Sequence, residues 1–514
     1  MNSPIADFVN DYVRKNPVRM HMPGHKGRIL SSVFNEDSWI RQIANYDITE
    51  IDGADYLSAP CGIIAESEAN AGKLFGCHTY YSTEGSSLCI RAMMFLVKKF
   101  ALQNGHEPFV LAGRNAHASF VNACSVLDIN VDWIMQKEND SYESCQINGE
   151  ELEEILKEYC SGDSSNNPDG NFKRMPDALY VTSPDYLGNM LNIEDLSKVC
   201  HRYGLMLLVD NAHGAYLKFL KESLHPIDLG ADMCCDSAHK TLPVLTGGAY
   251  LQVAYSDMNP ITKLVNENDN GYDLTLVRDF FAENARQALS IFATTSPSYL
   301  ILQSIDLCNV FLDGNTIIRE IAGKVFELKN RLTEKGYTLI GDEPMKITLY
   351  FSKKNSTLEI CGRLVDYLSE RNIFVEYHDD EHIVMMFSAD TMVFEFEKVE
   401  NALVSFSEET KLYLADRIDE KEKDGKGKVD KGLDETKLAF RGGKRKQAPL
   451  KAMTFKEAMM STSEFVDVEK SIGRVLAQPV LNCPPCVPIY MCGEIIGEDI
   501  KEYCNGKVAV VAEK

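Results

Sequence analysis

Two short segments carry the side chains with the clearest chemical potential. In Ser237-Ala-His-Lys240, a lysine closely follows a run of apolar residues, with a serine and a histidine nearby. Partial burial lowers the pKa of a lysine amine toward the range in which the amine acts as a nucleophile. The other segment begins at Asp210, which ends a second apolar run. An amine and a buried carboxylate together suit chemistry on a cofactor that has a carbonyl group and a protonated ring nitrogen.

A third segment has the features of an anion site. Ser82-Thr-Glu-Gly-Ser-Ser87 precedes a helical pattern from Leu88 to Phe100. Small residues at the start of a helix expose backbone N–H groups to a phosphate. Each of the three segments also has an ordinary interpretation, as a surface turn or a helix cap. Their spacing along one α/β pattern favours a common binding site.

The apolar runs predict how these segments are held. Residues 178–182, 205–209 and 231–235 are expected to be buried strands, and residues 192–203 have the apolar spacing of a covering helix. This alternation predicts a mostly parallel sheet. Ligands bind beyond the carboxyl ends of such strands, so the acid and the amine are expected to face one crevice.

Shifts in composition predict the domain organisation. We expect an N-terminal arm and active-site entrance over residues 1–60, a large cofactor-binding domain over 61–310, a smaller α/β domain over 311–415, a charged linker without fixed structure over 416–448, and a C-terminal module over 449–514.

Charge and composition exclude several classes of partner. Lys and Arg number 53 against 76 Asp and Glu, a formal net charge of −23 that repels nucleic acids and anionic membranes. No signal peptide and no apolar run of about 20 residues is evident, so a cytoplasmic protein without a membrane or nucleic-acid partner is expected. The 15 cysteines suit a reducing compartment. The spacing of Cys483 and Cys486 fits a redox or zinc pair, but their Pro-rich turn lacks the helix of a redox site, and we expect no metal.

Several motifs together resemble the Orn/Lys/Arg decarboxylase family, which are pyridoxal-phosphate enzymes of fold type I. They are His21-Met-Pro-Gly-His-Lys26, Asp47-Ile-Thr-Glu50 with Gly53 and Asp55, Ser237-Ala-His-Lys240, Thr294-Thr-Ser-Pro-Ser298, Pro484-Pro485 and Gly493-Glu494. The resemblance covers nearly the whole chain apart from the charged linker. It implies an α/β, aspartate-aminotransferase-like large domain with a smaller α/β domain and a C-terminal module. It resembles the short form of the family, without the N-terminal wing domain of some larger members.

The resemblance also implies roles for individual residues. Lys240 matches the lysine that holds pyridoxal 5'-phosphate covalently, Asp210 the partner of the ring nitrogen, and His117 the histidine that stacks on the ring. His239 is, with Lys240, a candidate proton donor. Cofactor contacts are further implied for Gly85, Ser86, Ser87, Ala212, His213, Ser237 and His239, and for Ser296 in the site of a neighbouring subunit. A homodimer or an assembly of dimers is therefore implied.

The implied reaction is the decarboxylation of arginine, lysine or ornithine to an amine and CO2, with a role in polyamine metabolism. Asp47, Glu50 and Asp55 are candidates for an acidic patch that receives the cationic end of such a substrate, or they are solvated surface charges. From the residues alone, an aminotransferase or lyase on the same scaffold, or a non-catalytic regulatory paralogue, stays open.

Overall fold

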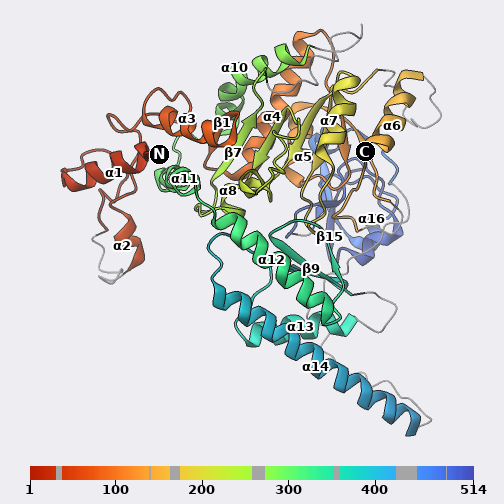
Figure 1. Cartoon of the computed structure of the whole chain (residues 1–514). Helices are drawn as coiled ribbons and strands as arrows, with labels where there is room; N and C mark the ends of the chain where they lie inside the picture. Colours follow the sequence, from red (N-terminus) through yellow and green to blue (C-terminus); the bar gives the residue numbers. More distant parts are fainter. Residues whose placement is uncertain are drawn as a thin grey trace.

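A seven-stranded sheet forms the centre of the large domain (Figure 1). The computed structural model describes residues 1–29, 38–137, 141–161, 174–257, 273–351, 358–423, 449–481 and 483–513. The strands, in spatial order, are β1 (His78–Ser82), β7 (Ala249–Val253), β6 (Met233–Asp236), β5 (Met206–Asp210), β4 (Ala178–Thr182), β2 (Phe109–Gly113) and β3 (Asn130–Ile134). Only β7 runs antiparallel to its neighbours, so the mostly parallel sheet expected from the sequence is confirmed.

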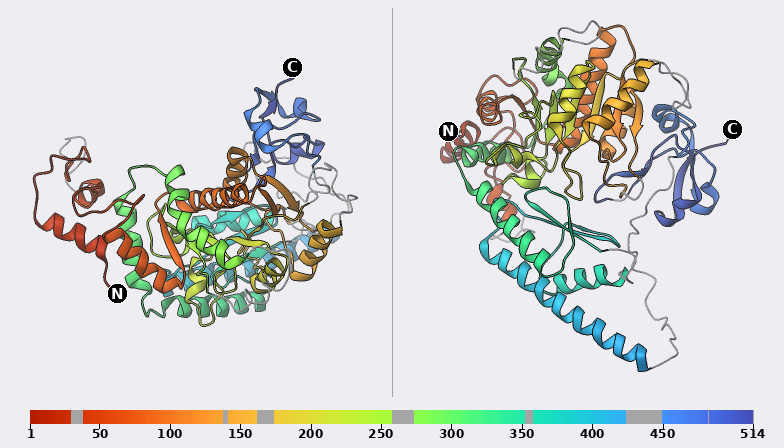
Figure 2. Two further views of the ribbon diagram at one scale, coloured as in Figure 1. Left: turned by 90° about the horizontal axis from the view of Figure 1, so that it is seen from above. Right: turned by 45° about the vertical axis from the view of Figure 1, so that its right-hand side comes forward.

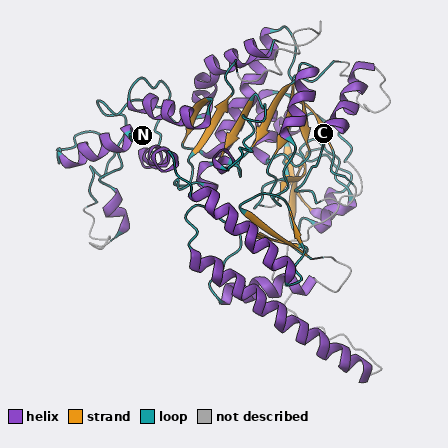
Figure 3. Cartoon of the chain, viewed as in Figure 1, coloured by secondary structure: helices purple, strands orange, loops and turns teal. Residues whose placement is uncertain are grey.

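Helices cover both faces of this sheet (Figure 3). One face packs against α4 (Gly85–Gln103), α5 (Ala118–Leu127) and α10 (Leu274–Phe292), and the other against α3 (Ile63–Phe75), α6 (Gly149–Ser161) and α7 (Ile193–Arg202). Along β5, Met206 and Leu208 join one hydrophobic cluster while Leu207 and Val209 join the other. Because both faces are covered, this strand is apolar throughout, which is why it appears in the sequence as a continuous apolar run.

The expected elements around the candidate residues agree closely with the observed ones. The strand expected at 178–182 coincides with β4, and the helix expected at 192–203 contains α7, whose N-cap Asn192 accepts a hydrogen bond from the Asp195 N–H. The other two strands were expected one or two residues too early. β5 and β6 both extend into an aspartate, because backbone pairing continues past the last apolar side chain: Asp210 still pairs with Cys235.

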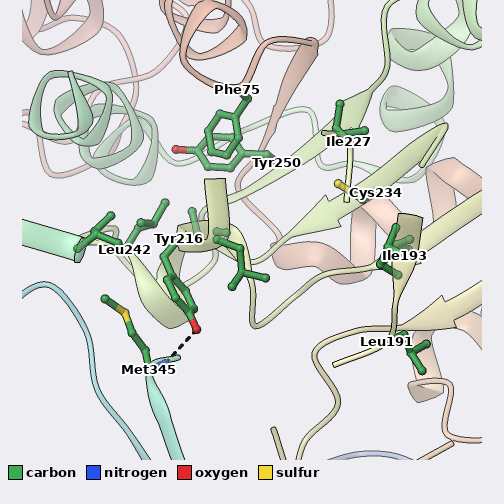
Figure 4. Close-up of a cluster of buried hydrophobic side chains, with 14 of the residues drawn as sticks. Phe75, Leu191, Ile193, Tyr216, Ile227, Cys234, Leu242, Tyr250 and Met345 are labelled. Atoms are coloured by element: carbon green, nitrogen blue, oxygen red, sulfur yellow. Dashed lines mark hydrogen bonds between the residues drawn. The ribbon is translucent and has the colours of Figure 1, made fainter. Parts of the chain in front are cut away.

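The smaller domain contains an antiparallel sheet, β10-β11-β9-β8, formed by Tyr377–His378, His382–Met386, Lys346–Tyr350 and Leu339–Ile340. The same domain contains the helices α12 (Ile317–Glu334), α13 (Leu358–Glu370) and α14 (Val393–Lys423). The backbone of this domain contacts the large domain where the Met345 N–H donates a hydrogen bond to the hydroxyl of Tyr216. Both residues are labelled in the cluster of Figure 4. Helix α11 (Tyr299–Leu312) leads into this domain along the chain.

The charged linker was expected to begin at residue 416, and this is wrong, because α14 continues to Lys423. The segment is rich in Glu and Lys, which are good helix formers, so a composition that cannot build a core can still extend a helix. The rest of the expected linker, residues 424–448, lies outside the described residues.

The C-terminal module packs around a small hydrophobic cluster that also includes Tyr142 of the large domain, and the module stands to one side of that domain (Figure 2). Its elements are α15 (Phe455–Met460), β12 (Ser463–Asp467), α16 (Val468–Ser471), β13 (Val480–Leu481), β14 (Pro488–Tyr490), a 3-10 helix (Glu498–Glu502) and β15 (Lys507–Val511).

At the other end of the chain, α1 (Pro4–Arg14) begins where the Asp306 carboxylate of α11 accepts hydrogen bonds from the N–H groups of Ile5 and Ala6, at 2.9 and 3.0 Å. A short helix, α2 (Trp39–Ile43), follows.

A buried arginine joins the C-terminal module to the large domain. Arg114, which follows β2, pairs with Glu494 at 3.1 Å and donates to the carbonyl oxygens of Pro488 and Ile489. Four residues further along the large domain, Ala118 N–H donates to the carbonyl of Cys486 at 3.0 Å. These contacts fix the segment 486–494 beside the carboxyl ends of the central strands.

No helix in the described ranges combines the length and the apolar character needed to cross a lipid bilayer.

Glu494→Gln should lower the free energy of unfolding by about 3 kcal/mol, because the guanidinium of Arg114 stays buried without the carboxylate. Urea denaturation followed by circular dichroism measures the change. The matched control is Glu464→Gln, which removes a more exposed pairing to Arg474 in the same module and should cost about 0.5 kcal/mol or less. Equal effects from the two substitutions would contradict a special role for the buried pair.

Candidate active site

A cavity of about 300 Å³ lies at the carboxyl ends of the central strands. Its walls come from the large domain and from the C-terminal module. The lining residues are Glu84, Gly85, Ser86, Ser87, Asn115, His117, Glu143, Thr182, Pro184, Tyr186, Asp210, Ala212, His213, Ser237, His239, Lys240, Thr246, Gly247, Pro485 and Val487. The cavity therefore brings together the three segments that the sequence singled out.

Lys240 presents its amine to this cavity. It sits in the short helix α8 (Ala238–Thr241), directly after β6, and its Nζ lies 3.1 Å from Nε2 of His213. Part of its surface is open to the cavity, but the surrounding protein excludes enough water to lower the pKa of the Lys240 amine, against the opposing effect of the Asp210 carboxylate. Burial, and the positive charge of Lys240, hold the pKa of His213 well below its ordinary value, so this imidazole is neutral.

Asp210 is held in place from three sides at the end of β5. Its Oδ1 accepts a hydrogen bond from Ala212 N–H at 3.2 Å, and Oδ2 accepts one from the Tyr180 hydroxyl at 3.2 Å. The thiol of Cys235 lies 3.5 Å from Oδ1. With its side chain 3% exposed, the carboxylate is fixed in direction and can hold a protonated nitrogen in the cavity.

One end of the cavity has the construction of a phosphate site. Helix α4 begins at Gly85, and Ser86 and Ser87 lie in its first turn. The hydroxyl of Ser237 donates to Ser86 Oγ at 2.8 Å, and that of Ser119 donates to Ser87 Oγ at 2.7 Å. The start of a long helix, with several hydroxyl groups beside it, provides N–H and O–H donors for an anion.

The backbone of this phosphate end favours glycine at two positions. Gly85 has a φ of +69° and donates its N–H to the carbonyl of Gly247 at 2.7 Å. Gly247 also has a positive φ, +101°, and a Cβ there would lie 2.8 Å from the carbonyl oxygen of Thr83. His239 closes this end, since both its backbone N–H and its Nδ1 lie within 3.1 Å of the Gly248 carbonyl.

His117 supplies a flat, neutral ring to the wall of the cavity. It is the N-cap of α5, where Nδ1 accepts a hydrogen bond from the Ser119 N–H at 3.1 Å. Burial lowers its pKa, although Asp210 opposes the change. A neutral imidazole held by its Nδ1 is suited to stacking on an aromatic ring. Together, the amine, the acid, the stacking ring and the anion site fit a phosphorylated pyridine cofactor.

A comparison with protein families identifies the family of the chain. A profile described as Orn/Lys/Arg decarboxylase, major domain, matches residues 3–341. The chain belongs to the Orn/Lys/Arg decarboxylase family. The resemblance expected from the motifs is therefore confirmed.

Related sequences and solved structures match this chain over most of their own length. The arginine decarboxylases of Bacillus anthracis and Bacillus subtilis are each 26% identical to it, over 98% of this chain and 92% of theirs. The lysine decarboxylases of Francisella novicida and Pseudomonas aeruginosa superpose on it with a TM-score of 0.73, at 15% and 17% identity, over 99% of this chain and 81% and 80% of theirs. The fold-type-I architecture is confirmed by these structures.

Four predicted site residues lie away from the cavity of their own chain. Ser296 is exposed on the connection between α10 and α11. Asp47 lies 3.1 Å from Nε2 of His25, and Glu50 does not line the cavity. The carboxylate of Asp55 caps α3, where it accepts hydrogen bonds from the N–H groups of Cys61, Gly62 and Ile64.

The capping role of Asp55 changes its chemistry. Partial burial acts to raise its pKa, but the backbone hydrogen bonds outweigh that effect and lower the pKa below the ordinary value. An acid so engaged has few lone pairs left for a ligand. In a single chain, the geometry gives Asp47, Glu50 and Asp55 no contact with a substrate in this cavity.

Several residues that line the cavity were not predicted from the sequence. Glu143 and Tyr186 lie in irregular segments without periodicity or a motif, so no local signal identifies them. Pro485 and Val487 belong to the C-terminal module, and only the contacts of Arg114 bring them here. Cys483 and Cys486, for which we predicted no redox role, are joined by a disulfide on either side of two prolines, the second of which lines the cavity.

Lys240→Ala should abolish covalent attachment of the cofactor, because no other lysine lines the cavity as described. We expect the variant, purified in the presence of pyridoxal phosphate, to lack the visible absorbance of the lysine-bound cofactor and to lose turnover. Absorbance spectra before and after gel filtration measure the attachment. A variant that keeps the absorbance would contradict the assignment of Lys240.

Proposed function

We propose that this member of the Orn/Lys/Arg decarboxylase family binds pyridoxal 5'-phosphate and uses it to remove CO2 from a basic amino acid. One observation carries the proposal: Lys240 and Asp210 line the same cavity as a helix start rich in hydroxyl donors. A non-catalytic paralogue would not require the amine, the acid and the stacking imidazole to converge. The names of the arginine and lysine decarboxylases that it resembles support the class of substrate.

The residues divide the work as follows. Ser86, Ser87 and Ser237 would hold the phosphate of the cofactor, and the imidazole of His117 would stack on its ring. The lowered pKa of Lys240 makes its unprotonated amine available for bonding to the cofactor carbonyl carbon. The carboxylate of Asp210 keeps a proton on the ring nitrogen. When bound, the cofactor supplies an electron sink for the bond that breaks at the substrate Cα.

The choice of reaction depends on orientation and on a proton. The cavity walls would orient the substrate on the cofactor, and this orientation would determine which bond to Cα breaks. Pro184, Pro485 and Val487 give part of the wall an apolar character that keeps water from the reacting carbon. Lys240 and His239 both line the cavity and are the candidates to return a proton to Cα after CO2 leaves.

The proposal includes a cytoplasmic homodimer, or an assembly of dimers, whose product amine enters polyamine metabolism. The exposed position of Ser296 supports this arrangement, because the side chain is free to contact another subunit.

The proposed activity is tested by incubating the protein and pyridoxal phosphate with arginine, lysine and ornithine in turn. We expect CO2 and the matching amine in equal amounts from at least one of them. Trapped ¹⁴CO2 and chromatography of the amine measure the two products. Release of a keto acid from any of them, or cofactor attachment without CO2 from all three, would favour an aminotransferase or lyase.

Asp210→Ala should separate attachment of the cofactor from its use. Lys240 remains, so the visible absorbance is retained, but the ring nitrogen loses its acid partner and kcat should fall by about 100-fold or more. Steady-state assays together with absorbance spectra measure both properties. Full activity in this variant would remove Asp210 from the mechanism.

A further inference from the structure

We propose that Glu143 binds the cationic end of the substrate side chain and so sets the preference for a basic amino acid. This inference rests on the proposed decarboxylase function and assigns a specificity residue within the same cavity. Glu143 lies between β3 and α6, is 1% exposed, and lines the cavity together with Lys240.

Elimination singles out this carboxylate. Of the residues that line the cavity, three are acids: Glu84, Glu143 and Asp210. Asp210 is the proposed partner of the cofactor ring nitrogen. Glu84 precedes the phosphate end, and its Oε1 accepts a hydrogen bond from the N–H of Thr294 at 2.7 Å. Glu143 is the remaining acid in the cavity wall, so it is the group available for a substrate cation.

The surroundings of Glu143 hold more negative than positive charge. Its Oε1 accepts a hydrogen bond from the Tyr377 hydroxyl at 2.5 Å, and its Oε2 accepts one from Ser141 at 3.0 Å. The same tyrosine oxygen lies 3.2 Å from Asp379, whose carboxylate pairs with His382 at 3.0 Å. Glu143, Asp379 and His382 thus form one buried cluster, and within the described ranges no lysine or arginine forms a salt bridge with Glu143.

This imbalance has a consequence for protonation. Burial, together with the nearby Asp379, raises the pKa of Glu143 to about 7. The hydroxyl of Tyr377 and the imidazole of His382 act in the opposite direction without cancelling the effect. A buried acid in this state gains from the approach of a cation, because the cation stabilises the charged form.

Aromatic rings connect this acid to the reactive amine. The Tyr186 ring lines the cavity and lies edge-on to His213, with 5.4 Å between centroids, and His213 contacts Lys240. On its other side, Tyr186 lies edge-on to Tyr377, also at 5.4 Å, and Tyr377 holds Glu143. The aliphatic part of a substrate side chain can therefore pack against aromatic carbon while its charged end reaches the carboxylate.

A second acid near this wall has a different task. Glu376 accepts a hydrogen bond from the Tyr186 hydroxyl at 2.8 Å and does not line the cavity. It therefore holds the aromatic wall in position, whereas Glu143 meets the cavity directly.

The test is Glu143→Gln in the complete enzyme loaded with pyridoxal phosphate. For the basic amino acid that the unmodified enzyme prefers, KM should rise by about 10- to 100-fold, as expected for the loss of one charged hydrogen bond, while kcat falls much less. If that substrate is arginine, the ratio of kcat/KM for arginine over citrulline, which has a neutral side chain of the same shape, should fall by a similar factor. A variant with unchanged KM and unchanged ratio overturns the inference.

The pH profile offers a second measurement. In the unmodified enzyme, KM should fall as pH rises through about 7, because Glu143 becomes charged. Glu143→Gln should lose this dependence. The titratable groups whose charge acts on Glu143 or responds to it are Tyr186, Tyr377, Asp379 and His382, and substitution of Glu143 leaves all of them in place.

A folding measurement does not depend on activity. A folded-state pKa raised to about 7 means that the folded protein loses stability as pH rises from about 4.5 to 7, where the buried acid ionises. The melting temperature of Glu143→Gln relative to the unmodified protein should therefore be higher at pH 8 than at pH 5. A difference that does not change with pH would contradict a buried, ionising Glu143.

Two controls separate the causes of failure. Ser141→Ala removes a neutral hydrogen bond to the same carboxylate but keeps its charge, so the arginine-to-citrulline ratio should change by less than about threefold. Retained visible absorbance shows that Glu143→Gln still holds the cofactor. If the unmodified enzyme releases CO2 from no basic amino acid, the proposed function fails; if it does so and Glu143→Gln behaves identically, only the present inference fails.

Discussion

The parallel pairing of β5 with β6 is the constraint on which the site depends. Asp210 pairs with Cys235 in this register, and Lys240 follows five residues after that cysteine. Two parallel neighbours end at the same edge of the sheet. The acid at the end of β5 and the amine just after β6 therefore both reach one cavity. A slip of one residue would turn Asp210 to the opposite face of the sheet, since successive side chains alternate. The clusters on both faces oppose such a slip, because it would move every apolar side chain of β5.

Much of this arrangement was predictable because its signals are local. Apolar runs that end in an aspartate identify β5 and β6, and small hydroxyl residues before a helical pattern identify the start of α4. Each signal lies within about ten residues of sequence, and the rule that ligands bind at carboxyl ends of parallel strands connects them. The boundary errors at β5, β6 and α14 have one cause: backbone hydrogen bonds continue where apolar side chains stop.

The rest of the site was not predictable because it depends on tertiary contacts. Glu143 is placed by Tyr377, which comes from the smaller domain, and Pro485 is placed by the pairing of Arg114 with Glu494. The placement of Asp55 has the same origin. Asp55 has the charge expected of a substrate-binding group, but the sequence does not reveal that backbone N–H groups of α3 already occupy its carboxylate.

The lining of the cavity, which runs in sequence from Glu84 to Val487, also bears on how the protein is made. Domains of a growing chain fold as units from the amino end, and the central sheet has all its strands once Val253 has left the ribosome. The cavity wall at that stage still lacks the segment that Arg114 holds. A nascent chain therefore acquires its sheet long before it acquires a closed site, and synthesis of more than two hundred further residues separates the two events.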